Sequence, residues 1–103
     1  MDCHVTQQDG TVFFRLTGKV DEEGAEFLKR QFNSLQLPLV KELIIDMRDS
    51  SSIGSSGIGK MLLFYKHLAG HHATIRLEHV PRATYELLRE LKLHTLFDIT
   101  TNE

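Results

Sequence analysis

Several residue types are scarce in this chain, and each scarcity excludes a class of protein. Its single cysteine, Cys3, cannot form an internal disulfide and is typical of the reducing cytoplasm. No apolar run approaches the ~18 residues that a transmembrane helix needs, and no charged segment followed by an apolar one opens the chain. The net charge of −2 leaves no excess of lysine and arginine for binding nucleic acid. We therefore expect a soluble cytoplasmic protein that binds neither membranes nor nucleic acid.

The length and composition indicate one globular domain that comprises residues 1–103. A chain of 103 residues buries enough surface to fold without disulfides or metals. Its hydrophobic share of 41% and charged share of 25% are those of a globular domain and not of a disordered chain. No internal repeat, linker or low-complexity segment divides it, and we expect a monomer or a weak dimer.

The apolar pattern predicts an α/β fold. Asp9-Gly10 between two alternating runs predicts a hairpin, and Asp21 is a suitable N-cap for a first helix. Apolar residues at helical spacing from Ile58 predict a central helix that ends at Gly70. The expected order is strands at 3–7 and 11–16, a helix, a strand at 43–45, the central helix, a strand at 73–77, a helix from Pro81 and a short strand at 97–100. We expect a mixed sheet of four to five strands with three to four helices packed against it, and right-handed crossovers place segment 46–56 at its carboxyl edge.

A serine-rich segment joins the central strand to the central helix. Ser55 and Ser56 should lie at the positive end of that helix. Three interpretations are open: the hydroxyls cap the helix, the free backbone N–H groups bind an anion, or one hydroxyl is itself a phosphate acceptor.

The same segment has a partial likeness to a nucleotide-binding loop. Gly54 to Lys60 satisfies the first seven positions of the Walker A pattern. Met61 stands where a Ser or Thr hydroxyl must reach the magnesium ion, and seven residues separate Asp46 from Gly54, whereas a P-loop follows its strand almost directly. A P-loop-like nucleotide-binding protein is therefore only a remote alternative.

The histidines do not predict a metal site. His67, His71 and His72 lie close together, but no Glu or Cys accompanies them at a ligand spacing. Cationic side chains are favoured at the negative end of a helix, so we interpret this group as a solvated helix end. We expect neither a metal nor a cofactor.

Five segments, in this order and at this spacing, resemble the STAS domains of bacterial anti-anti-sigma factors, which are also called anti-sigma factor antagonists. They are Leu16–Asp21 (LTGKVD), Leu43–Asp46 (LIID), Ser55–Gly59 (SSGIG), His72–Leu77 (HATIRL) and Pro81–Phe97. The resemblance implies the STAS fold and a regulatory module that is not an enzyme. It implies as partner an anti-sigma factor that is also a serine kinase, release of that partner when Ser55 is phosphorylated, and a serine phosphatase that acts on the phosphorylated form.

The resemblance and the helix geometry together predict the partner-binding surface. The resemblance implies the serine and glycine positions of the SSGIG motif and the acidic position before the first helix. We expect the central helix to face the sheet with Ile58, Met61, Leu62 and Tyr65. Leu63 and Phe64 would then face outward, where large apolar side chains act as anchors for a partner. The predicted partner-binding residues are Asp21, Ser55, Ser56, Gly57, Gly59, Lys60, Leu63 and Phe64.

The chain departs from the family pattern just before the serine pair. Gly54 stands where members that are regulated by phosphorylation commonly have Asp, and Ser50 and Ser52 stand at positions that are usually apolar. These departures keep one alternative open within the same fold, a STAS scaffold or transporter-associated module that is never phosphorylated.

Overall fold

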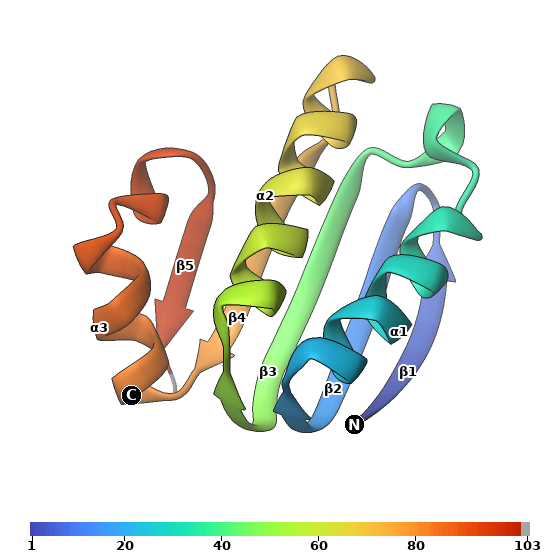
Figure 1. Ribbon diagram of the computed structural model, residues 1–103. Coiled ribbons are helices and arrows are strands. Elements are labelled where there is room, and N and C mark those ends of the chain that lie inside the picture. Colours follow the sequence, from blue (N-terminus) through green and yellow to red (C-terminus); the bar gives the residue numbers. More distant parts are fainter. Residues whose placement is uncertain (102–103) are drawn as a thin grey trace.

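The computed structural model describes residues 1–101, which form an α/β domain with one five-stranded mixed sheet (Figure 1). The sheet order is β1-β2-β3-β4-β5, so each strand lies beside its neighbour in sequence. This confirms the predicted mixed sheet with helices against it. The elements are β1 (Asp2–Gln8), β2 (Thr11–Val20), α1 (Glu22–Asn33), the 3-10 helix η1 (Leu37–Leu39), β3 (Glu42–Ile53), α2 (Ser55–Gly70), β4 (Thr74–Val80), α3 (Arg82–Glu90), the 3-10 helix η2 (Leu93–Thr95) and β5 (Asp98–Thr101).

The direction of the strands follows from their connections. β1 and β2 are antiparallel and are joined by the predicted tight turn, in which Asp9 and Gly10 both have positive φ, the condition for a type I′ hairpin. The pairs β2·β3, β3·β4 and β4·β5 are parallel, because each connection contains a helix. The carboxyl ends of these parallel strands therefore lie at one edge of the sheet.

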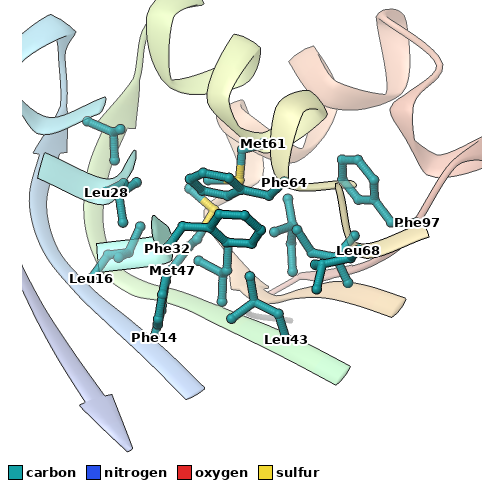
Figure 2. Packing of buried hydrophobic residues seen from close by; sticks show 14 of the residues in the cluster. Phe14, Leu16, Leu28, Phe32, Leu43, Met47, Met61, Phe64, Leu68 and Phe97 are labelled. Carbon is teal, nitrogen blue, oxygen red and sulfur yellow. The ribbon is translucent and has the colours of Figure 1, made fainter. Parts of the chain in front are cut away.

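The core lies between the sheet and the helices α1 and α2, which lie side by side on one face (Figure 1). In β2 the alternating residues Val12, Phe14 and Leu16 are completely buried, and their neighbours Phe13 and Arg15 are exposed on the other face. Figure 2 shows side chains of both helices meeting above the strands. The rings of Phe32 and Phe64 stack there with their centroids 4.3 Å apart, which joins α1 to α2.

Strand β3 is much longer than predicted. The segment 46–56 was expected to be a loop, but residues 46–53 belong to β3, which remains paired with β2 as far as Val20. Two register shifts in that pairing, with Gly18 at φ +94°, let the second half of β3 stay in the sheet. Residues 47–53 extend beyond the β3·β4 pairing, which ends at Asp46. Their polar side chains are exposed except that of Ser50.

Helix α2 ends as predicted at Gly70, but the left-handed residue that follows is not a glycine. His72 takes φ +58°, and the Ala73 N–H donates to the Leu68 carbonyl at 2.8 Å. This is the Schellman pattern at a helix carboxyl terminus. No helix in the described residues is long and apolar enough to cross a membrane.

Candidate functional site

The candidate site lies where β3 passes into α2, at the carboxyl edge of the sheet. Gly54 joins the two elements, and its N–H donates to the Val20 carbonyl at 2.9 Å. Val20 pairs with Ile53 at the ends of β2 and β3, and Asp21 follows Val20 directly. The amino termini of α1 and α2 therefore lie at the same edge (Figure 1), and both direct their positive ends toward it.

Gly57 fixes the first turn of α2 against the strands. A β-carbon at this residue would lie 2.7 Å from Ile53 Cγ1 and 2.8 Å from Val20 Cγ1, closer than any real contact. Gly57 is buried, so it cannot belong to an exposed docking surface as predicted. Its function in the structure is to let the helix approach the sheet and so to set the position of the serine pair.

The serine pair occupies the first two positions of α2. The N-cap is Gly54, which has no side chain to cap the helix, so the interpretation of Ser55 or Ser56 as the N-cap is wrong. Ser55 is exposed and Ser56 is half-buried. Within residues 1–101 the Ser55 hydroxyl forms no hydrogen bond, so another molecule can reach it.

Asp21 is the N-cap of α1, as predicted. Its Oδ1 accepts a hydrogen bond from the Gly24 N–H at 2.9 Å. This hydrogen bond, helped by the nearby Lys19 charge, lowers the pKa of the Asp21 carboxyl. Asp21 is exposed and is followed by Glu22 and Glu23 in the first turn of α1, so this edge of the site carries negative charge at neutral pH.

Gly59 and Lys60 differ in how strongly the rest of the chain holds them. Gly59 is exposed, and a β-carbon added there would meet nothing within 4 Å. The Lys60 ammonium lies 3.2 Å from Glu26 Oε1, so the half-buried lysine links α2 to α1 by an ion pair. The structure thus leaves open space above Gly59, one turn beyond Ser55.

The predicted outward position of Phe64 is wrong. Phe64 is 0% exposed and packs in the core against Phe32 (Figure 2). The predicted orientation took only the contact between α2 and the sheet into account. Helix α2 also packs against α1, and this second contact rotates the buried stripe of α2 by about one residue. The stripe is Gly57, Met61, Phe64 and Leu68.

The same rotation changes the exposure of the neighbouring leucines. Leu62, which was expected to face the sheet, is 36% exposed, and Leu63 is half-buried. Leu62 therefore replaces Phe64 as a large apolar side chain that another molecule can reach.

Ser50 is a residue of this region that sequence reasoning did not single out as a site. Its side chain is 3% exposed, and among the described residues its hydroxyl oxygen has no hydrogen-bond partner. A buried hydroxyl without a partner lowers stability relative to an apolar group of the same size. The one sequence signal is that Ser50 stands at a position that is usually apolar in the family, but Ser52, which shares that signal, is exposed.

The structure does not build a Walker A loop from Gly54 to Lys60. Residues from Ser55 onward are helical, and the Ile58 N–H already donates to the Gly54 carbonyl at 3.1 Å, so this backbone cannot wrap around phosphates. Met61 is buried in the core. The predicted gap of seven residues between the central strand and Gly54 is wrong, however, because β3 ends directly before Gly54. Within residues 1–101, no group of three or more His, Cys, Asp or Glu side chains could hold a metal ion.

The mixed sheet, the two helices on one face and the serine pair at the start of α2 define an α/β domain with a candidate site at a helix amino terminus. The family model of the STAS domain matches residues 3–103, so the chain belongs to the STAS domain family. This confirms the resemblance drawn from the five sequence segments.

Solved structures share this fold at low sequence identity. An anti-sigma factor antagonist from Mycobacterium paratuberculosis matches with a TM-score of 0.84 at 19% identity, over 96% of this chain and 84% of that protein. The phosphorylated form of the Bacillus cell fate determinant SpoIIAA matches with a TM-score of 0.78 at 18% identity, over 97% of this chain and 92% of that protein. A sulfate transporter family protein from Wolinella succinogenes matches with a TM-score of 0.77 at 17% identity, over 88% of this chain and 76% of that protein. These likenesses show the fold, which antagonists and a transporter-family protein have in common.

Proposed function

We propose that this protein is an anti-sigma factor antagonist without catalytic activity of its own, which works by partner switching. In its unmodified form it binds an anti-sigma factor that is also a serine kinase. That kinase phosphorylates Ser55 and is released, and a serine phosphatase restores the binding form. The observation that carries the proposal is the exposed and unbonded Ser55 hydroxyl at the first position of a helix that Gly57 holds against the sheet.

The chemistry of the modification is a phosphoryl transfer from ATP that the kinase supplies. Ser55 Oγ forms the new bond to the γ-phosphorus, the bond from that phosphorus to the bridging oxygen breaks, ADP leaves, and the hydroxyl proton passes to a base of the kinase. The exposed hydroxyl needs no movement of the surrounding backbone to reach a kinase active site. The phosphate that results lies at the positive end of α2, which favours negative charge.

The charge of that phosphate accounts for release of the partner. A phosphoserine adds about −1.5 to −2 charges at pH 7. Asp21 and the glutamates of α1 already make the neighbouring edge negative. A partner surface that fits this edge without the phosphate would have to desolvate the added charge, and a loss of only ~2.8 kcal/mol weakens binding about a hundredfold.

Gly59 supports the view that this surface binds a protein. Glycine in the interior of a helix costs about 0.5–1 kcal/mol relative to alanine. Among the described residues, no atom outside the backbone of α2 lies within 4 Å of where a β-carbon of residue 59 would be. A partner that approaches the α2 backbone closely beside Ser55 would explain why a residue without a side chain stands there. The proposed docking surface comprises Asp21, Ser55, Ser56, Gly59, Leu62 and Leu63. The predicted Lys60 is not included, because its ammonium is paired with Glu26.

The test is to incubate the purified protein with each candidate kinase anti-sigma factor from the same genome and ATP, and to read the intact mass and the modified residue. We expect one phosphate on Ser55, no transfer to Ser55→Ala, and normal transfer to the control Ser34→Ala, whose exposed serine lies at the carboxyl end of α1, away from the docking surface. A gain of phosphate that survives Ser55→Ala, or no binding by any candidate, would contradict the proposal.

Gly54 favours a second candidate function, that of a STAS scaffold or transporter-associated module that is never phosphorylated. The chain has no carboxylate at the position directly before the serine pair. In that case a candidate partner should bind stably in the presence of ATP, without phosphate transfer and without release.

A further inference from the structure

Strand β1 forms an edge of the sheet that is open to pairing. In the described residues it is hydrogen-bonded to β2 alone, and it lies at the outer side of the sheet, beyond α1 (Figure 1). Its register with β2 is unbroken over seven consecutive pairs, from Asp2 opposite Thr17 to Gln8 opposite Thr11. The other side of β1 therefore presents a regular row of backbone N–H and C=O groups.

The two edges of the sheet differ in their protection against pairing. Proteins protect edge strands by making them short, by bulges, or by lysine and proline. The other edge strand, β5, has four residues, and its register with β4 is shifted between Leu77 and Val80. β1 has seven residues and contains no proline, lysine or arginine. It also carries an exposed apolar side chain, because Val5 is 37% exposed.

We propose that β1 pairs with β1 of a second copy of this chain, antiparallel and about a two-fold axis at Val5, so that the dimer has one continuous sheet of ten strands. The sequence of the strand is complementary to itself in this register. Val5 lies opposite the second Val5, His4 opposite Thr6, Cys3 opposite Gln7 and Asp2 opposite Gln8. No two like charges face each other, and the exposed valines meet as a cross-strand pair.

In this dimer the outward backbone N–H and C=O groups of the two β1 strands form hydrogen bonds with each other. The only edge strands that remain are the two short β5 strands. Val5 lies opposite Phe14 in the β1·β2 pairing, so it is on the face of the sheet that carries the helices. The valine pair would therefore lie between the two α1 helices and lose its exposure to water.

The dimer keeps both copies of the candidate site accessible. β1 begins at the edge of the sheet where the helices α1 and α2 also begin (Figure 1). Asp21 is the N-cap of α1 and Ser55 is the first residue of α2. Because the two β1 strands run in opposite directions, the two sites point to opposite ends of the ten-stranded sheet. One dimer can then bind two partners that do not touch each other, and dimerisation does not depend on the proposed function of Ser55.

Sedimentation velocity over a range of protein concentrations tests the dimer. We expect the wild-type mass to rise from that of the 11.8 kDa chain toward twice that value. Val5→Lys places two ammonium groups opposite each other and should weaken dimerisation at least about tenfold. Val5→Glu should do the same, and an equimolar mixture of the two variants should regain the dimer.

Phe13→Lys is the matched control. Phe13 is 39% exposed, similar to Val5, but it lies on β2 and on the helix-free face, so this variant should dimerise like wild type. Reducing buffer prevents dimers that are linked by a Cys3–Cys3 disulfide. Such a disulfide is also disfavoured because burial raises the pKa of the Cys3 thiol to about 11, which keeps the thiol protonated. Circular dichroism confirms that each variant is folded.

Three results would overturn the inference. The first is a wild-type protein that remains monomeric at the highest concentration measured. The second is a folded Val5→Lys variant that dimerises as well as wild type. The third is a mixture of Val5→Lys and Val5→Glu that stays monomeric while wild type dimerises, because the strands would then not meet at Val5.

Discussion

Gly57 and Ile53 are in such close contact that a β-carbon on residue 57 would lie 2.7 Å from Ile53 Cγ1. This contact joins the last residue of β3 to the first turn of α2. It determines how deeply the helix lies on the sheet and, through the helix, where the Ser55 hydroxyl is presented.

Gly57→Ala should therefore destabilise the protein. The added methyl group overlaps two buried side chains, Ile53 and Val20, and overpacking of this kind costs about 1–3 kcal/mol. Urea denaturation followed by circular dichroism measures the change. An unchanged free energy of unfolding would mean that α2 can shift away from the strands at little cost.

Gly59→Ala should have the opposite effect on stability. The methyl group has open space among residues 1–101, so the gain in helix propensity should raise the free energy of unfolding by about 0.5–1 kcal/mol. If the proposed docking surface is correct, the same variant should bind the anti-sigma factor more weakly, as measured by calorimetry.

Gly70→Ala is the control for this variant. Gly70 is also in α2 with open space around its α-carbon, but it lies at the opposite end of the helix from Ser55. It should leave partner binding unchanged. Equal binding by wild type, Gly59→Ala and Gly70→Ala would exclude a close approach of the partner at Gly59.

Leu62→Ser and Phe64→Ser should separate docking from packing. Phe64 is in the core, so removing its ring should cost about 3–5 kcal/mol of stability. Leu62 is partly exposed, so Leu62→Ser should lower the melting temperature much less and should reduce partner binding. A larger loss of stability in Leu62→Ser than in Phe64→Ser would contradict the position of the helix.

Asp21 should make stability depend on pH in the acid range. The hydrogen bond from Gly24 lowers the pKa of the Asp21 carboxyl in the folded protein below its ordinary value. The charged carboxylate therefore stabilises the fold at pH values above that ordinary pKa. This contribution disappears as the pH falls through the lowered pKa. Asp21→Asn keeps a side-chain oxygen for the cap but cannot titrate, so its stability should change less between pH 5 and pH 2 than that of wild type.

Chemical denaturation at a series of pH values measures this difference. Asp21→Ala, which loses both the cap and the charge, should be less stable than Asp21→Asn at low pH. If the free energy of unfolding falls equally with pH in wild type and in Asp21→Asn, other carboxylates, and not Asp21, cause the acid dependence.

The sequence predicted the fold because local signals and tertiary structure agree over most of the chain. The Asp9-Gly10 turn, the Asp21 cap and the central apolar run each correspond to an element that the structure contains. The position of the serine pair at the carboxyl edge also followed, because right-handed crossovers leave little choice for a parallel sheet.

The errors arose where tertiary contacts override local patterns. The polar second half of β3 reads as a loop, but pairing with β2 across the bulge at Gly18 holds it in the sheet. Phe64 was expected to face outward because helical periodicity gives the width of a buried stripe and not its rotation. The stacking of Phe64 on Phe32 sets that rotation, and it depends on a second helix.

The affinity of the protein for its anti-sigma factor, before and after phosphorylation of Ser55, tests the central claim most directly. Isothermal titration of the same kinase anti-sigma factor with unmodified protein, with Ser55-phosphorylated protein and with Ser55→Ala gives the three dissociation constants. We predict that Ser55→Ala binds about as tightly as the unmodified protein and that the phosphorylated form binds at least about a hundredfold more weakly. Equal affinity of the phosphorylated and unmodified forms would contradict the switch.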